Sequence, residues 1–380
     1  MASTLTVPVA VIQNVRIHPN ADKLDLCDVL GYQMAIPKGK YKDGDIVVYI
    51  PADTILPNEW AEKFGVKDFL KGQEKDRVGK IKLRGEPSFG LVVGLPENED
   101  WEVGKNVADY YGCKKYYPPL KATDEDAAKY DERIDPFVSR YTDIENGRIY
   151  TEVFVDGEEV ICTEKLHGTN CKVGKIKDVG IFAGSMSTRR KRPQKPSWHP
   201  KTWIGRLYVW IFGMKYIDIE FDEKEMKTAK YWNPFSLDGV RALLNDLTID
   251  NNIVILYGET YGGSVQSLNY GISKGECLGF KAFDIKIDDK YLDWDKFKEL
   301  CDKYDIPVVP VLYRGPYSME KMKEIADGKS TIENANHIRE GIVTKPVVER
   351  TDIKIGRAVL KYISTEYELS KHKERDTTDA

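Results

Sequence analysis

The stretch ICTEKLHGTNCKVG, residues 161–174, decides how the rest of the chain is interpreted. Residues 160–162 favour a β-strand, an Asp-Gly turn precedes them, and residues 172–174 favour a returning strand. We therefore expect Lys165 at the mouth of a hairpin, where a side chain projects from a rigid sheet into a cleft. Because a lone lysine at a strand end is most often a solvated surface residue, a functional role for Lys165 depends on partners elsewhere in the chain.

Composition limits the kinds of protein that the chain can be. The sequence has 380 residues, 41% hydrophobic and 31% charged, which is enough for two or three domains with their own cores. The net charge of −4 excludes a uniformly basic protein that wraps nucleic acid, so a polyanion site has to come from a local patch. The six cysteines include no CxxC pair, which argues against a zinc ribbon or a disulfide framework and favours reduced thiols in a cytoplasmic protein.

Two segments bear on membrane association. The first residues, MASTLTVPVAVIQNV, have no basic region followed by a long apolar core, so no signal peptide is predicted. The most apolar window, residues 203–214, is too short to span a bilayer and contains Arg206. We expect this window to form a buried or capping helix, and we expect no membrane association.

Residues 1–110 have the pattern of an all-β domain. Short apolar runs such as DIVVYIP and FGLVVGLP alternate with turn sequences such as KGKYKDGD, which predicts a small barrel. The segment VRIHPNADKLDLCDV and the runs that follow it resemble the OB-fold module of tRNA-binding domains. This barrel is interpreted as a nucleic-acid platform, with a purely structural barrel as the alternative. The basic residues that would follow a phosphate backbone are Arg16, Lys23, Lys80, Lys82 and Arg84.

The remainder divides into three parts. Residues 111–135 are rich in charge and proline without sustained periodicity, and they are predicted to be a linker. Residues 136–368 mix strands and helices, with helices expected after an Asp293 cap and after a Ser318 cap. Residues 369–380 are polar and charged, which predicts a loose tail.

Four further motifs follow the lysine. NNIVILYGETYGG carries Glu259, and FKAFDIKID carries Phe283 and Asp284. REGIVTKP carries Glu340 and Lys345, and GRAVLKYIS carries Lys361. Taken singly, such strand-borne charges and aromatics are usually a solvated face or part of a core.

Together and in this order, these motifs resemble those of the lysine nucleotidyltransferases, the ligases and capping enzymes that carry a nucleoside monophosphate on lysine. His167 stands where most DNA ligases and capping enzymes have aspartate, as in the bacteriophage RNA ligase 2 group. The OB-like module comes first, and too few residues follow Lys361 for a second barrel. That arrangement resembles the Deinococcus-type RNA ligases, the RNA ligase 5 family.

The resemblance implies an α+β fold, with an N-terminal all-β OB-fold barrel (1–110). A linker (111–135) leads to a mixed α/β nucleotidyltransferase domain, ATP-grasp-like and with antiparallel sheets (136–368). It also implies ATP and a divalent metal, Mg²⁺ or Mn²⁺, as cofactors, and RNA with 3′-OH and 5′-phosphate ends as partner, preferably at nicks in duplexes. A monomer is expected.

The implied site residues fall into four groups. The catalytic residues are Lys165, Glu340 and Lys361. The nucleotide-binding residues are Glu164, His167, Gly168, Asn170, Arg189, Glu259, Phe283 and Lys345. The RNA-binding residues are Arg190, Arg192 and Lys195, and the metal ligands are Glu340 and Asp284.

Several alternatives remain open at this level. The last motif often has two lysines two residues apart, but position 363 is isoleucine, so Lys354 or Arg357 is expected to compensate. The cations from Arg189 to Lys195 form either an RNA contact or a solvated loop. The rival functions are a GTP-dependent capping guanylyltransferase and an inactive tRNA-binding or RNA-binding protein. Because the nucleotide motifs all follow residue 160, the barrel is expected to be dispensable for lysine adenylylation.

Overall fold

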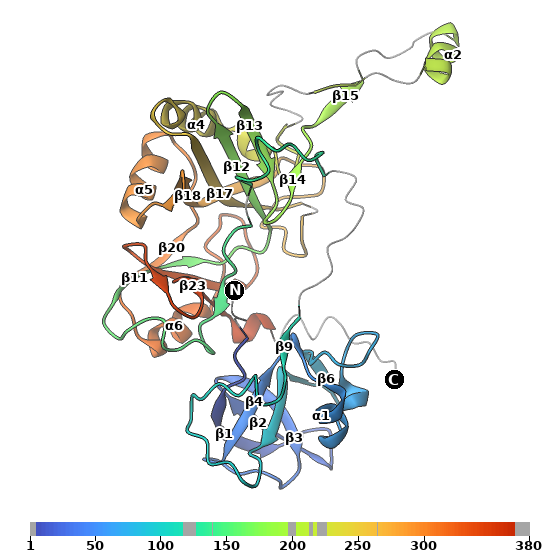
Figure 1. The fold of residues 1–380 in the computed structure, drawn as a ribbon, viewed down its shortest axis with the longest axis vertical. Coiled ribbons are helices and arrows are strands. Elements are labelled where there is room, and N and C mark those ends of the chain that lie inside the picture. Colours follow the sequence, from blue (N-terminus) through green and yellow to red (C-terminus); the bar gives the residue numbers. More distant parts are fainter. Residues whose placement is uncertain are drawn as a thin grey trace. The chain divides into compact units, whose positions relative to one another are not determined.

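The computed structural model describes residues 5–116, 127–138, 140–196, 203–212, 216–218, 226–263 and 265–368 (Figure 1). The chain divides into two compact units. The barrel unit comprises Met1–Lys121, Glu145–Val155 and Thr351–Ala380, and the sheet unit comprises Ala122–Ile144 and Asp156–Arg350. Each unit is therefore built from segments that are far apart in the sequence.

The barrel unit is organised around a five-stranded antiparallel sheet that nearly closes into a barrel. Its strands are β1 (Val9–Ile17), β2 (Leu24–Val29), β3 (Tyr32–Pro37), β4 (Ile46–Pro51) and β8 (Gly90–Gly94), in the order β3-β2-β1-β4-β8. Leu30 and Gly31 both have positive φ, 53° and 77°, which suits a two-residue turn between β2 and β3. Alternate side chains enter two hydrophobic clusters, so both faces of the sheet are buried.

Smaller elements complete the barrel. They are β5 (Thr54–Ile55), paired with β9 (Lys114–Lys115), β6 (Ile81–Leu83), paired with β7 (Glu86–Ser88), α1 (Asn58–Lys63) and η1 (Lys67–Phe69). Tyr111 is buried in one barrel cluster, so the chain contributes to this core beyond residue 110. Of the predicted linker, residues 117–126 lie outside the described residues.

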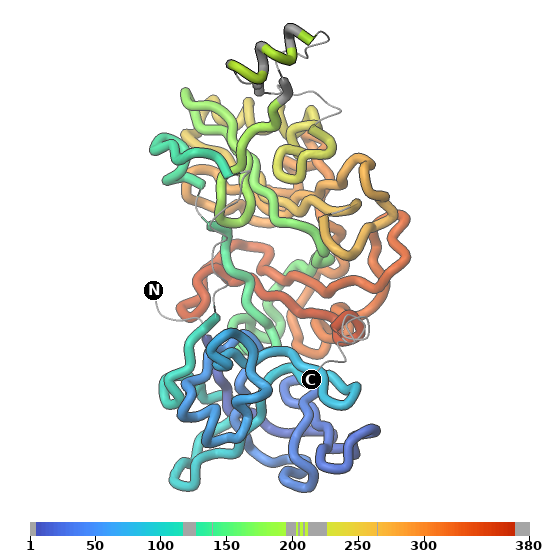
Figure 2. The backbone as a smooth tube through the Cα atoms, turned by 90° about the vertical axis from the view of Figure 1, so that its right-hand side faces the viewer, coloured from blue at the N-terminus to red at the C-terminus, as the bar shows by residue number. Residues whose placement is uncertain are grey.

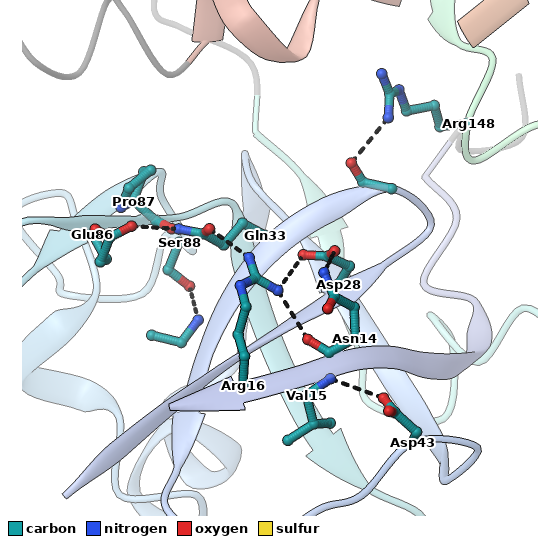
Figure 3. Close-up of polar contacts among 12 residues, drawn as sticks. Asn14, Val15, Arg16, Asp28, Gln33, Asp43, Glu86, Pro87, Ser88 and Arg148 are labelled. Carbon is teal, nitrogen blue, oxygen red and sulfur yellow. Dashed lines mark hydrogen bonds and ion pairs between the residues drawn. The ribbon is translucent and has the colours of Figure 1, made fainter. Parts of the chain in front are cut away.

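A polar network crosses the barrel surface around Arg16 (Figure 3). Arg16 Nη1 donates to Asp28 Oδ1 at 3.0 Å and to the Asn14 carbonyl at 2.9 Å. Arg16 Nη2 donates to Gln33 Oε1 at 2.7 Å, and Gln33 Nε2 donates to Glu86 Oε2 at 3.1 Å. This guanidinium, one of the expected phosphate contacts, is thus held by groups of the barrel itself.

Two later segments belong to the barrel unit. β10 (Glu145–Asn146) pairs in parallel with β24 (Leu360–Ile363), and β22 (Thr351–Asp352) pairs with β23 (Gly356–Arg357). The Lys115 ammonium lies 2.6 Å from Glu145 Oε1, and both side chains are largely buried. The predicted tail, 369–380, lies outside the described residues.

The sheet unit contains a six-stranded antiparallel sheet whose path can be followed from green to orange in Figure 2. Its strands are β14 (Arg189–Arg190), β13 (Gly180–Gly184), β12 (Thr169–Ile176), β17 (Ile253–Tyr261), β18 (Gly279–Ile287) and β19 (Lys290–Tyr291), in that spatial order. One face packs against η2 (Asn233–Ser236), α4 (Asp238–Asp250) and α5 (Trp294–Lys303), and together they form the largest hydrophobic cluster of the described residues. The opposite face carries most of the polar side chains considered below.

A second group of strands in the sheet unit carries the lysine of the opening motif. β11 (Glu159–Glu164) pairs antiparallel with β20 (Val311–Pro316) on one side and with β21 (Gly341–Pro346) on the other. α6 (Met319–Ala326) covers it, and the Ser318 hydroxyl accepts from Lys321 N at the predicted cap. Asp293 precedes α5 as predicted, but its carboxylate accepts from Glu349 N at 2.7 Å.

The apolar window after residue 202 forms α2 (Trp203–Phe212). In the sequence, this helix follows β15 (Gln194–Pro196) and precedes β16 (Tyr216–Asp218). A helix is present as expected, but the expected burial is wrong for the side chains that the structure describes. Trp203 is 74% exposed and Trp210 is 81% exposed, because no described element covers this face. Within the described residues, no helix combines the length and the apolar character needed to cross a bilayer.

Candidate active site

Lys165 lies immediately after β11 and is held in place by a carboxylate. Its backbone N–H donates to the Gly341 carbonyl at 2.9 Å, which continues the β11–β21 pairing by one residue. Its Nζ lies 2.8 Å from Glu340 Oε1, and the lysine side chain remains 25% exposed. The central strand of a paired group therefore presents this amine to solvent in a fixed position.

Glu340 is shared between Lys165 and His167. His167 Nδ1 lies 3.1 Å from Glu340 Oε2, while the lysine occupies the other oxygen. Burial alone raises the pKa of the Glu340 carboxyl, but the charge of Lys165 and the hydrogen bonds from His167 and Lys165 lower it to about 2. Glu340 is thus a carboxylate at neutral pH and orients both side chains.

His167 is fixed from its other side by a loop that the sequence motifs did not identify. Its Nε2 lies 3.1 Å from Ser267 Oγ, and its backbone N–H donates to the Tyr270 hydroxyl at 2.6 Å. Tyr270 is buried and packs edge-on against Tyr261 and His337. The serine and the tyrosine therefore connect the loop after β17 to the lysine motif.

A row of polar side chains crosses the sheet next to this group. Asn170 on β12 is directly opposite Glu259 on β17, which is opposite Lys281 on β18, so the three share one face. The Gly168 N–H donates to Glu259 Oε1 at 3.1 Å. A Cβ at Gly168 would lie 2.3 Å from the Thr260 carbonyl oxygen, so only glycine fits there.

The row has two features of a binding surface. Burial raises the pKa of Glu259 to about 8, against the opposing charge of Lys165, so this group carries a proton at neutral pH. Asn170 Oδ1 is buried and has no hydrogen-bond partner in the protein. A buried acceptor left in this state is normally satisfied by a ligand or a water molecule.

Lys281 was not identified from the sequence, although the alternation of FKAFDIKID places it on the same face as Phe283. Burial lowers its pKa, and the charge of Glu164 acts in the opposite direction. Phe283 is half-buried, with its ring centroid 5.3 Å from that of Tyr141. Phe283 thus lies on the strand that carries Lys281, with one aromatic neighbour already in place.

Three of the expected site carboxylates and cations are engaged inside the protein. Glu164 is buried, and its oxygens accept from Thr331 N at 2.8 Å, Thr331 Oγ1 at 2.7 Å and Ser330 Oγ at 2.5 Å. Lys345 and Asp284 form a buried ion pair, and the Tyr141 hydroxyl also donates to Asp284. In the structure these side chains hold a loop and a core together, and their roles toward nucleotide and metal stay predictions.

The basic residues after β13 make aromatic contacts. The guanidinium of Arg190 lies 4.6 Å from the centre of the Tyr231 ring, and that of Arg192 lies 5.3 Å from the Trp232 ring. Arg189 Nε lies 3.1 Å from Asp135 Oδ1, and both side chains are largely buried. The side chain of Lys195 lies outside the described part of the structure.

Lys361 belongs to the barrel unit rather than to the unit that holds Lys165. It lies on β24, where it is half-buried. The two residues expected to replace a second lysine are in the same unit: Lys354 pairs with Glu152, and Arg357 is buried on β23. An approach of Lys361 to Lys165 remains a prediction.

The described residues contain no group of three or more histidine, cysteine or acidic side chains able to enclose a metal ion. A cation used in phosphoryl transfer commonly keeps several waters and binds through one or two carboxylates and substrate phosphates. Glu340, ionised and partly exposed beside Lys165, fits such a site.

The chain matches two family models. The RNA ligase model matches residues 158–363, more than half of the chain, and an OB-fold domain model matches residues 6–95. The chain therefore belongs to the RNA ligase family. The OB-fold match and the antiparallel sheets confirm the predicted α+β class with an N-terminal barrel.

Solved structures give the same fold. The Naegleria gruberi RNA ligase with PPi superimposes with a TM-score of 0.63 at 22% identity, covering 98% of this chain and 100% of that chain. A lysine-to-alanine variant of that ligase with ATP and Mn gives a TM-score of 0.62 at 22% identity, with the same coverage. A search of curated protein sequences gave no significant match.

Proposed function

We propose that this chain is an ATP-dependent RNA ligase that acts through a covalent adenylate on Lys165. The observation that carries the proposal is the contact of Lys165 with Glu340, which in turn holds His167, at the edge of the Asn170 and Glu259 row. A fixed amine at a strand end, partly exposed beside an unsatisfied polar surface, suits a nucleophile that receives a nucleotide. A surface lysine needs none of these neighbours.

The proposed ligation reaction has three steps. The neutral Lys165 amine attacks the α-phosphorus of ATP, forms a phosphoramide bond and releases pyrophosphate. The RNA 5′-phosphate then attacks the same phosphorus, which frees the lysine and leaves AMP joined to the RNA end. Finally the RNA 3′-OH attacks the activated 5′-phosphate, forms the phosphodiester and releases AMP.

The residues of this chain have distinct tasks in that sequence. Glu340 orients the lysine before reaction, but an ion-paired ammonium is not a nucleophile, so the amine has to give up its proton and leave this pair before it attacks. Asn170 and protonated Glu259 offer hydrogen bonds to the nucleotide, and Phe283 offers an aromatic face to the base. A divalent metal, Mg²⁺ or Mn²⁺, would be held by Glu340 together with substrate oxygens and would neutralise phosphate charge.

The substrate and subfamily are inferred from the order of domains. A barrel that precedes the lysine motif is the arrangement of the Deinococcus-type RNA ligases, and it supports nicked duplexes as substrates. The Naegleria ligase structures with ATP and Mn support ATP over GTP.

Covalent labelling tests the proposal. The protein is incubated with a divalent metal and either α-³²P ATP or α-³²P GTP, and the Lys165→Ala variant is compared with Lys175→Ala on the same sheet unit. We expect label from ATP in the wild type and in Lys175→Ala, and none in Lys165→Ala. Label from GTP alone would favour a capping guanylyltransferase, and no label with either nucleotide would favour an inactive RNA-binding protein.

The basic segment supports contact with RNA phosphates. Neutralised phosphates release condensed counterions, so each cation adds about one unit to the salt dependence of binding. We expect Arg192→Ala and Lys195→Ala to flatten the salt dependence of nicked-RNA binding, whereas Lys296→Ala on α5 leaves it unchanged. A change at Arg189 or Arg190 is expected to slow adenylylation as well. Equal slopes in all variants would favour a solvated loop.

A further inference from the structure

We propose that Lys345 and Asp284 are positioning residues whose ion pair fixes a β-bulge at Phe283 and so directs the Phe283 ring toward the bound base. The inference rests on the proposed function, because it assumes that Phe283 receives the base of ATP. It gives the buried pair a task in nucleotide binding that requires neither residue to contact the nucleotide or a metal. All of the residues concerned lie in the sheet unit.

The pairing of β18 with β17 shifts by one residue at Phe283. Tyr257 is opposite Asp284, whereas the next residue, Gly258, is opposite Ala282. Phe283 is therefore an extra residue of β18 with no partner on β17. Such a β-bulge bends the strand and changes the direction of its side chains, and bulges are common beside active sites.

The bulge changes which side chains of β18 face the helices. Before it, Phe280 and Ala282 belong to the large hydrophobic cluster that includes α4 and α5, and after it Ile285 belongs to that cluster. Regular alternation would place residue 284 in the same cluster. Instead, Phe283 packs against two clusters on the opposite face, and Asp284 lies on that face as well. Two adjacent residues thus share the face that carries the polar row.

Lys345 holds this bulge from β21. Its Nζ donates to the Phe283 carbonyl at 3.1 Å and forms an ion pair with Asp284 Oδ1. The two charged side chains are 7% and 2% exposed. Asp284 Oδ2 accepts from the Tyr141 hydroxyl, and the Tyr141 ring is the one that lies 5.3 Å from the Phe283 ring. One lysine therefore binds both the carbonyl of the bulge residue and the side chain that follows it.

Stability alone does not account for such a pair. The Lys345 ammonium lies 5.2 Å from the centre of the Trp294 ring and 5.4 Å from that of Phe297, among residues of the hydrophobic cluster. Removing two charges from water offsets much of their attraction, and well-packed apolar side chains are often equally stable. Apolar side chains would not bind the Phe283 carbonyl, so the pair contributes the local conformation of the bulge.

The expected consequence is a weaker hold on ATP when the pair is lost. Phe283 is half-buried, so part of its ring is open to a ligand. An aromatic ring stabilises a bound base only when their faces are correctly oriented. A ring that is no longer directed by the bulge is therefore expected to lose ATP affinity, whereas Lys165 and its contacts are unchanged.

A double variant, Lys345→Met with Asp284→Asn, tests the inference, because it leaves no unpaired charge in the core. The matched control is Arg350→Met with Glu158→Gln, which neutralises an ion pair with contacts of 2.6 and 2.7 Å at the ends of β11 and β21. Single-turnover adenylylation is measured over a range of ATP concentrations, beside thermal unfolding. We expect the first variant to raise the ATP concentration for half-maximal rate about two- to tenfold with little change in the maximal rate. The control is expected to keep the wild-type value.

Coupling to Phe283 separates positioning from general damage. In a Phe283→Leu background, which has no aromatic face, the Lys345 and Asp284 substitutions are expected to cost no further ATP affinity, because they act through that ring. Tyr141→Phe, which keeps both charges and its own ring, gives a milder variant and is expected to show a smaller loss with the same dependence on Phe283.

Losses that add to that of Phe283→Leu, or an unchanged ATP dependence in both the neutralised pair and Tyr141→Phe, would overturn the inference. Failure of the proposed function gives a different result: the wild type would then form no adenylate, or Lys165→Ala would still be labelled.

Discussion

Arg16 in the barrel and Lys165 in the sheet unit make an instructive comparison. Each is a cation beside a carboxylate, and their side chains are similarly exposed, 34% and 25%. Arg16 is held by Asp28, Gln33 and a carbonyl in a network that continues within the barrel (Figure 3). Exposure and an ion pair therefore do not distinguish a structural cation from a reactive one.

The surroundings do distinguish them. Beside Lys165, one carboxylate is shared by two side chains, Asn170 has a buried acceptor without a protein partner, and Glu259 is buried with its pKa raised to about 8. A buried acceptor without a partner and a buried carboxyl both cost free energy in the empty protein. Binding sites commonly contain such groups, because a bound ligand removes that cost. The Arg16 network uses its donors internally, so it contributes to the barrel fold.

Exchanging the two cation types gives the largest expected contrast. Lys165→Arg keeps the charge but is expected to abolish covalent labelling, because a guanidinium does not deprotonate and cannot act as the nucleophile. Arg16→Lys is expected to keep labelling and to lower the free energy of unfolding by about 1 kcal/mol, because an ammonium cannot reproduce the forked contacts. Labelling and denaturant unfolding measure the two outcomes, and labelled Lys165→Arg would contradict this division of roles.

The polar row gives the next largest effect. Glu259→Ala removes a contact proposed to hold the nucleotide and is expected to cost about 1.5–3 kcal/mol in ATP use, which is about tenfold or more in kcat/KM. Phe283→Ala is expected to cost a comparable or smaller amount through loss of the aromatic face. Adenylylation rates against ATP concentration provide the measurement. Unchanged kinetics in both variants would mean that the nucleotide binds elsewhere.

The pH dependence of stability gives a smaller effect at the same residue. Burial raises the pKa of Glu259 from 4.5 to about 8, so the folded protein retains a proton that the unfolded chain has lost. Stability from this group is fully present below about pH 4.5 and is lost as the pH rises through about 8. We expect Glu259→Gln to be less sensitive to pH than the wild type in denaturant unfolding of nucleotide-free protein across roughly pH 5 to 9. Parallel curves for the two proteins would contradict the raised pKa.

The sequence was sufficient for local features of the fold and insufficient for contacts made at a distance. Alternation and turn residues predicted the barrel strands, and the periodicity after Asp293 predicted α5, because these depend on near neighbours. Tertiary packing determines the ion pair of Lys345 with Asp284. It also determines the hydrogen bonds that Ser330 and Thr331 donate to Glu164.

The order of the motifs in the sequence also did not predict to which unit each residue belongs. Lys361 follows the other nucleotide motifs in sequence, yet its strand pairs with β10 in the barrel unit. The exposure of α2 was not predicted for a similar reason. An apolar window in the sequence indicates a side-chain surface that favours burial, but it does not show whether another element packs against that surface. Ser267 was missed because a serine in a polar loop has no distinctive spacing.

Ser267 gives the smallest expected effect and the closest test of how the reactive group is held. His167 Nδ1 faces the Glu340 carboxylate, which favours the tautomer with the proton on that nitrogen and leaves Nε2 to accept from the Ser267 hydroxyl. Ser267→Ala removes this second contact while leaving Glu340, Lys165 and the Tyr270 contact in place. We expect adenylylation or AMP transfer to RNA to slow about two- to tenfold, with restoration in Ser267→Thr, whose hydroxyl occupies a similar position.

The control is Ser273→Ala, an exposed serine farther along the same connection, which is expected to match the wild type. The ¹⁵N chemical shifts of the His167 ring add a readout that general destabilisation does not move, because they report which ring nitrogen carries the proton. A shift toward mixed tautomers in Ser267→Ala but not in Ser273→Ala would tie the slower reaction to the orientation of His167. If the alanine variant reacts at the wild-type rate with the same ring shifts, Glu340 alone orients the histidine, and the reactive region depends on fewer residues than the comparison with the Arg16 network implies.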